Sequence, residues 1–93
     1  ELLFERLNRH GVDYVVVGGL AVVAHGGGLP TEDVDICCEF SVDNLMRLQA
    51  ALEGLHPVHR MTPQKLPLNL AAQNCRLLKN LYIGTDVGQL DCL

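Results

Sequence analysis

The stretch VVGGLAVVAHGGGLPTEDVDI, residues 16–36, decides the fold. It opens with the β-branched end of a predicted strand, because a run of valines after a tyrosine favours a buried β-strand. We expect that strand to end in a sharp turn at Gly18 and Gly19, and a short helix to follow over residues 20–25. After a loop rich in glycine and proline, residues 33–39 predict a second strand. The sequence therefore predicts strand, turn, short helix, loop and strand.

Asp33 and Asp35 lie two residues apart in the second predicted strand. Residues at this spacing share one face of a strand, about 7 Å apart, while Val34 and Ile36 face the core on the other side. Two neighbouring carboxylates resist ionisation together unless a cation neutralises them, and a hard divalent ion such as Mg²⁺ prefers oxygen ligands. We therefore expect Asp33 and Asp35 to bind a metal.

The Gly18-Gly19 pair is the candidate phosphate site. Glycine lets the backbone approach a ligand closely. A helix over residues 20–25 would present unpaired N–H groups and the positive end of its dipole at the same place. The expected arrangement is a phosphate site beside a carboxylate pair.

Outside this stretch the pattern predicts two amphipathic helices and three further strands. The helices are expected at residues 2–10 and 41–54, and the strands at 56–61, 81–83 and 89–93, the last two forming a hairpin. Residues 62–75 contain two prolines and allow no assignment. The predicted fold class is α+β (α/β-like), with a mixed sheet of about four or five strands and helices packed on it.

Composition limits the classes of function. With 93 residues, 48% of them hydrophobic, the chain is expected to be a single domain, residues 1–93, and no apolar run approaches the length of a membrane span. A net charge of −4 gives no bulk attraction for nucleic acid. Cys37 and Cys38 are adjacent and no secretory segment is visible, so reduced thiols in the cytoplasm are expected. Because the chain starts at Glu1 and stops inside an apolar stretch, we expect the domain to be truncated at one or both ends.

Residues 16–36 resemble the signature of the DNA-polymerase-β-like nucleotidyltransferase superfamily. In that signature an apolar residue and Gly-Gly or Gly-Ser precede a spacer and an Asp-x-Asp flanked by apolar residues; here the spacer is residues 20–32. The superfamily has a third carboxylate on a later strand, and Asp91 in GQLDCL matches it. The chain is most similar in style to small bacterial and archaeal members of the antibiotic and toxin–antitoxin types.

The resemblance implies a nucleotidyltransferase fold and a Mg²⁺-dependent enzyme. Asp33, Asp35 and Asp91 would be catalytic and would bind two Mg²⁺ ions, with Mn²⁺ as a substitute, while Gly18 and Gly19 would hold the triphosphate of ATP or another nucleoside triphosphate. The reaction implied is transfer of a nucleoside monophosphate to an acceptor hydroxyl on a small molecule, a tRNA or a protein. A partner protein or a homo-oligomer is a further expectation.

Alternative interpretations exist for the third carboxylate and for the function. In one alternative, Asp91 is an ordinary exposed residue of an edge strand. In another, Asp86 in the hairpin turn is the third carboxylate, although turns favour Asp for structural reasons. The rival functions are a non-catalytic nucleotide-binding or interaction module of a toxin–antitoxin system, and a purely structural interaction domain.

The remaining polar residues carry weaker expectations. Glu32 is expected to face solvent, and His25 to cap or pack at the end of the short helix. Arg60 and Lys65 are either solvated charges, the favoured interpretation, or contacts to phosphate. The other histidines and the cysteines lack metal-ligand spacing, so zinc is not expected.

Overall fold

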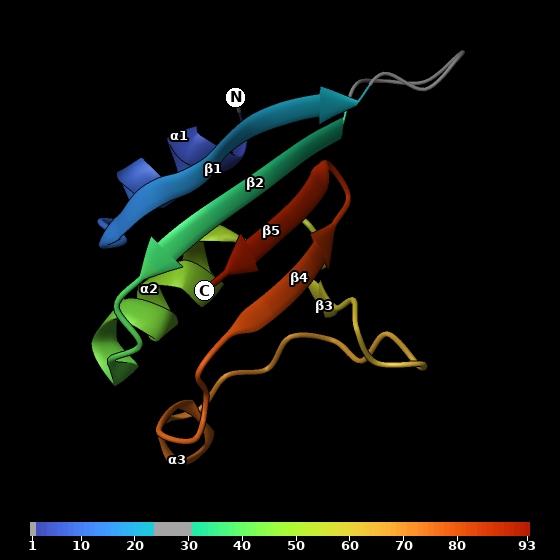
Figure 1. Cartoon of the computed structure of the whole chain (residues 1–93). Helices are drawn as coiled ribbons and strands as arrows, with labels where there is room; N and C mark the ends of the chain where they lie inside the picture. The colour runs from blue at the N-terminus through green and yellow to red at the C-terminus, as the bar shows by residue number, and fades with distance from the viewer. Residues whose placement is uncertain (1, 24–30) are drawn as a thin grey trace.

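A mixed five-stranded sheet organises residues 2–23 and 31–93, the part of the chain that the computed structural model describes (Figure 1). The strands lie in the order β1-β2-β5-β4-β3, and only β2 and β5 run parallel. Their bounds are β1 (Tyr14–Val23), β2 (Thr31–Cys38), β3 (Val58–His59), β4 (Leu81–Thr85) and β5 (Gly88–Cys92). The predicted α+β class, mixed sheet and C-terminal hairpin are confirmed.

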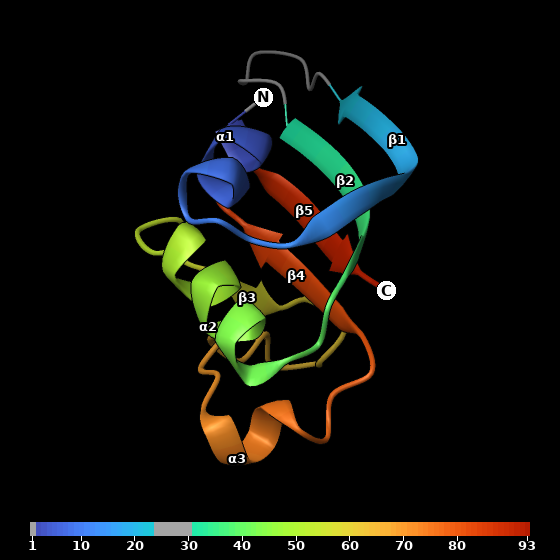
Figure 2. The same ribbon diagram turned by 90° about the vertical axis from the view of Figure 1, so that its left-hand side faces the viewer.

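The first two helices pack on one face of the sheet (Figure 2). They are α1 (Leu2–Arg9) and α2 (Val42–Ala51), both close to their predicted ranges. A third, α3 (Ala72–Cys75), lies in the segment that allowed no assignment. Within the described ranges no helix is long and apolar enough to cross a membrane.

Strand alternation separates the core from the open face. On β2 the side chains of Val34, Ile36 and Cys38 are buried under the helices, while Asp35 and Cys37 are exposed on the other side. The core is completed by apolar side chains of both helices and of the hairpin, among them Leu3, Leu7, Leu45, Leu48, Leu81, Ile83 and Leu90. Burying these side chains on one face leaves the opposite face free for polar residues.

Strand β1 corrects two predictions. It runs through Gly18 and Gly19 instead of ending there, and residues 20–23 form strand instead of helix. Between Val16 and Leu20 the strand advances four residues while β2 advances two, so the glycines lie in an irregularity of the ladder. Pairing with β2 supplies backbone hydrogen bonds that the short helix would have supplied, and the valines of this segment favour strand.

Glu32 is buried, so its predicted exposure to solvent is wrong. Its carboxylate accepts hydrogen bonds from the backbone N–H groups of Leu2 (3.1 Å) and Leu3 (3.4 Å), at the start of α1. A carboxylate there satisfies free N–H groups and meets the positive end of the helix dipole. Glu32 therefore fixes α1 against β2.

Asn44 ties α2 to the strands. Its side chain is 1% exposed; the amide oxygen accepts from Asp13 N at 2.7 Å, and the amide nitrogen donates to the carbonyls of Asp13 (3.0 Å) and Glu39 (2.8 Å). Its backbone N–H donates to the Ser41 hydroxyl, which caps the helix. One side chain thus joins the start of α2 to the segments before β1 and after β2.

Candidate active site

Asp33 and Asp35 lie on the face of the sheet opposite α1 and α2. The alternation of β2 brings both side chains there, with Asp33 half-buried and Asp35 exposed. This confirms the predicted parity, because Val34 and Ile36 are buried on the other side. The two carboxylates share a surface that the core does not use.

Asp91 joins them from β5. In the parallel pairing of β2 with β5, Asp35 is the register partner of Asp91, and Asp33 is the partner of Gln89. Register partners on adjacent strands point to the same face, and the strands lie about 4.8 Å apart. Asp33, Asp35 and Asp91 therefore occupy one small area of the open face.

Arg60 is bound to Asp91 by two parallel hydrogen bonds. Its Nε donates to Oδ1 at 3.0 Å and its Nη2 donates to Oδ2 at 2.5 Å. The guanidinium carbon also lies 5.5 Å from the centre of the Tyr82 ring, within the range of a cation–π contact. Sequence reasoning favoured a solvated charge for Arg60, and the structure instead places it in the site.

The strand order explains why these residues meet. Asp35 pairs with Asp91, Asp91 pairs with Tyr82, and the Arg60 N–H donates to the Tyr82 carbonyl at 3.0 Å. The four residues form one row across β2, β5, β4 and the end of β3. Nothing local in the sequence around Arg60 signals this contact, because it depends on which strand lies beside which.

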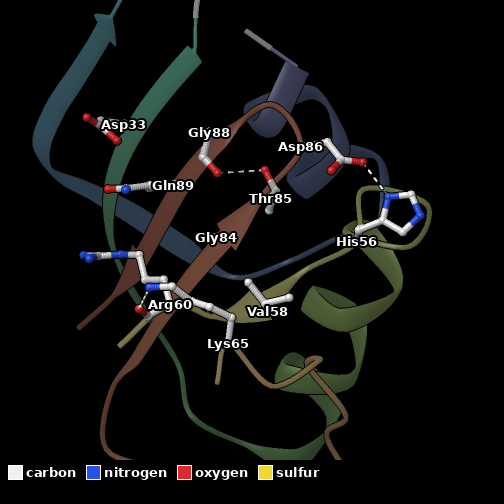
Figure 3. A pocket seen from close by; sticks show the side chains of 10 residues that line it. All are labelled: Asp33, His56, Val58, Arg60, Lys65, Gly84, Thr85, Asp86, Gly88 and Gln89. Atoms are coloured by element: carbon white, nitrogen blue, oxygen red, sulfur yellow. Dashed lines mark hydrogen bonds and ion pairs between the residues drawn. The ribbon is translucent and has the colours of Figure 1, made fainter. Parts of the chain in front are cut away.

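A pocket of about 620 Å³ opens next to this row. Asp33, Gln89 and Arg60 project to the same side of the sheet in Figure 3, while Lys65 and Val58 border the pocket from the β3 side. The full lining is Asp33, His56, Val58, Arg60, Lys65, Gly84, Thr85, Asp86, Gly88 and Gln89. Acidic and basic side chains thus line one concave surface of the size that small ligands use.

Gly84 forms part of the pocket floor. A Cβ atom at this position would lie 3.4 Å from Arg60 Cβ and 3.5 Å from Val58 Cγ2. The absence of a side chain on the open face of β4 therefore leaves the space between the strands free. The sequence alone led to no prediction for Gly84. The signal that could have found it is an isolated glycine within a strand, which often marks a close approach of another group.

The charges in the site act on Arg60. The hydrogen bond to Asp91 raises the pKa of Arg60; burial acts in the opposite direction, and the negative charges of Asp91 and Asp33 raise it further. Arg60 is therefore a permanent cation that both carboxylates stabilise. Lys65 lies on the outer rim, where its Nζ donates to the Arg60 carbonyl at 2.5 Å.

The three aspartates offer the oxygen ligands that Mg²⁺ prefers. Within residues 2–23 and 31–93, however, no group of three or more His, Cys, Asp or Glu side chains is arranged to hold a metal ion. Both oxygens of Asp91 are engaged by Arg60. The donor chemistry and the shared face of the three carboxylates suit Mg²⁺, but their side chains are not arranged as a metal site in this structure, in which Arg60 is bound to Asp91.

The backbone at Gly18 and Gly19 does not form the turn and helix start that were predicted for a phosphate site. Both glycines lie in β1, and because residues 20–23 are strand, no helix N-terminus follows them there. His25 lies outside the described residues. Asp86, the competing third carboxylate, instead lies in the hairpin turn and contacts the imidazole of His56, with 2.5 Å between Oδ2 and Nδ1 (Figure 3).

Comparisons with protein-family models, with curated proteins and with solved structures found no match to this chain.

Proposed function

We propose that this chain is a metal-dependent nucleotidyltransferase domain, with a nucleotidyltransferase fold, that transfers a nucleoside monophosphate from a nucleoside triphosphate to an acceptor hydroxyl. The observation that carries the proposal is the register pairing of Asp35 with Asp91, beside Asp33 on the same open face. Three carboxylates on two adjacent strands match the arrangement that the sequence signature implies. The pocket beside them gives space for the substrate.

The aspartates divide the work in this proposal. Asp33 and Asp35 would hold two Mg²⁺ ions, and Asp91 would be a further metal ligand that takes the proton of the acceptor hydroxyl. Such a metal pair lowers the pKa of the attacking hydroxyl and stabilises the leaving pyrophosphate. The acceptor oxygen forms a bond to the α-phosphorus while the bond between that phosphorus and the α,β-bridging oxygen breaks, so pyrophosphate leaves.

A second candidate is a nucleotide-binding or interaction module without turnover. The observation that favours it is the bidentate contact of Arg60, which occupies both oxygens of the third carboxylate. In such a module Asp91 serves to hold Arg60 and binds no metal. The two candidates differ in whether pyrophosphate is produced.

The test is incubation with labelled ATP, CTP, GTP and UTP, Mg²⁺ and candidate acceptors, namely aminoglycosides, tRNA and protein. We expect label on one acceptor class and an equal amount of pyrophosphate, both abolished by EDTA. Nucleotide binding without transfer to any acceptor supports the binding module. Absence of both binding and transfer contradicts the enzyme and the nucleotide-binding module, and leaves an interaction module.

A further inference from the structure

The guanidinium of Arg60 is fully oriented in the structure. Two of its nitrogens donate to Asp91, and Nη1 donates to Met61 Sδ at 3.3 Å, while the guanidinium carbon lies over the Tyr82 ring. The side chains of Arg60 and Asp91 are 24% and 18% exposed. Arg60 therefore contacts the Tyr82 ring and also lines the pocket, while its contact with Asp91 stays partly exposed.

Asp91 cannot serve Arg60 and a metal ion in the same way at the same time. Both carboxylate oxygens accept hydrogen bonds from Arg60, and a metal ligated by Asp91 would bring a second cation to the same oxygens. Like charges at this separation repel strongly in a partly buried site. Metal binding by Asp91 is therefore favoured when Arg60 turns to another anion.

The pocket has room for an anion that could bind Arg60 in place of Asp91. Arg60 and Lys65 both line it, and Gly84 leaves its floor open directly beside the Arg60 Cβ atom. A guanidinium binds phosphate oxygens with the same two-pronged geometry that it uses for a carboxylate. A polyphosphate in this pocket would therefore replace Asp91 as the partner of Arg60 without loss of hydrogen bonds.

We propose that Arg60 is a phosphate-binding residue that exchanges partners, binding Asp91 when the site is empty and the phosphates of the nucleoside triphosphate when Asp91 ligates the metal. Lys65 adds a second positive charge at the rim of the same pocket. This inference rests on the proposed function and adds to it a source of phosphate binding other than Gly18 and Gly19. It also gives Arg60 the role of protecting three close carboxylates from mutual repulsion before substrate arrives.

The exchange predicts changes of opposite sign in two titrations of the same variant. Calorimetry would measure the binding of Mn²⁺ alone and, separately, of inorganic tripolyphosphate without metal. Arg60→Gln frees Asp91, so Mn²⁺ binding tightens about fivefold, while tripolyphosphate binding weakens about tenfold. A residue that only supported the fold would weaken both.

Asp91→Asn is expected to change both affinities in the opposite directions. The uncharged amide holds Arg60 less strongly, so tripolyphosphate binding tightens about fivefold, while Mn²⁺ binding weakens by at least about tenfold. The matched control is Arg76→Gln, which removes one positive charge from an exposed position next to α3, away from the pocket. We expect both dissociation constants of the control to stay within about twofold of those of the unmodified chain.

Circular dichroism would show that each variant is folded. If Arg60→Gln does not fold, Arg60→Lys keeps the charge, loses the two-pronged geometry, and predicts the same signs with smaller changes. The inference is overturned if the Arg60 variant fails to tighten Mn²⁺ binding, or if Asp91→Asn weakens tripolyphosphate binding.

Failure of this inference is distinct from failure of the proposed function. A chain that transfers label from a nucleoside triphosphate, but whose Arg60→Gln variant behaves like Arg76→Gln, overturns the exchange alone. A chain that binds neither Mn²⁺ nor any nucleoside triphosphate overturns both.

Discussion

His56 shows how a single contact controls a titration at the residue scale. Its hydrogen bond to Asp86, with the charge of that carboxylate, raises the pKa of His56, while desolvation acts against it. Because the folded pKa lies above the unfolded value of about 6.5, the contact stabilises the fold fully below that pH. This stabilisation is lost as the pH rises through the folded pKa.

NMR titration of the imidazole tests this. We expect Asp86→Asn to lower the midpoint of His56 toward its ordinary value, since the main cause of the shift is removed. Asp43→Asn is the control: it removes an exposed carboxylate from the first turn of α2, whereas His56 follows the last turn, and it should leave the midpoint unchanged. Equal midpoints in the unmodified chain and in Asp86→Asn would show that the pair does not form in solution.

Gly88, at the start of β5, lies against the backbone of Glu32 in β2. With a φ angle of 146°, it has a backbone conformation that other residues rarely adopt, and a Cβ atom would lie 1.9 Å from the Glu32 carbonyl oxygen. We expect Gly88→Ala to lower the free energy of unfolding by at least about 3 kcal/mol, measured by urea denaturation. Gly54→Ala is the control: its φ is also positive, at 86°, but nothing lies within 4 Å, so it should cost only about 1 kcal/mol. Similar losses for both variants would contradict the close approach.

At the scale of elements, Asn44 holds α2 to the segments before β1 and after β2. Asn44→Ala removes three side-chain hydrogen bonds to backbone groups of Asp13 and Glu39. We expect the free energy of unfolding to fall by about 2–3 kcal/mol, as measured by thermal and urea denaturation. Asn80→Ala, at an exposed position, should change it by less than about 0.5 kcal/mol. Equal effects of the two substitutions would count against the network.

Strand β4 shapes the pocket through Gly84. A valine there suits a strand but fills the space next to Arg60 and Val58. We expect Gly84→Val to weaken binding of a non-hydrolysable nucleoside triphosphate about tenfold, while the free energy of unfolding changes by less than about 1 kcal/mol. Cys37→Val adds a similar side chain to the open face of β2 outside the pocket lining and should leave affinity unchanged. Undiminished binding by Gly84→Val would place the nucleotide elsewhere.

At the scale of the whole molecule, the sequence predicts what depends on local pattern. The period of two puts Asp33 and Asp35 on one face, and the turn between residues 85 and 88 sets the hairpin that carries Asp91. Residues 20–23 were predicted wrongly because a turn and a helix were expected after the two glycines, whereas the valines and the pairing with β2 favour strand.

Contacts between distant segments account for the rest. Glu32 caps a helix some thirty residues before it, and Arg60 reaches Asp91 only because β3 and β5 lie on either side of β4. Such contacts follow from strand order, which the pattern of a single chain does not specify. The aspartates of the candidate site could therefore be predicted, but their cationic partner could not.

The central claim is that Asp33 and Asp35 bind a nucleoside triphosphate through a metal. Calorimetric titration with a non-hydrolysable nucleoside triphosphate, with and without Mg²⁺, tests it most directly. We predict that Mg²⁺ tightens binding at least about tenfold and that Asp35→Ala loses this gain, while Asp43→Ala binds like the unmodified chain. Mg²⁺-dependent affinity that is unchanged in Asp35→Ala, or no Mg²⁺-dependent binding of any nucleoside triphosphate, would contradict the claim.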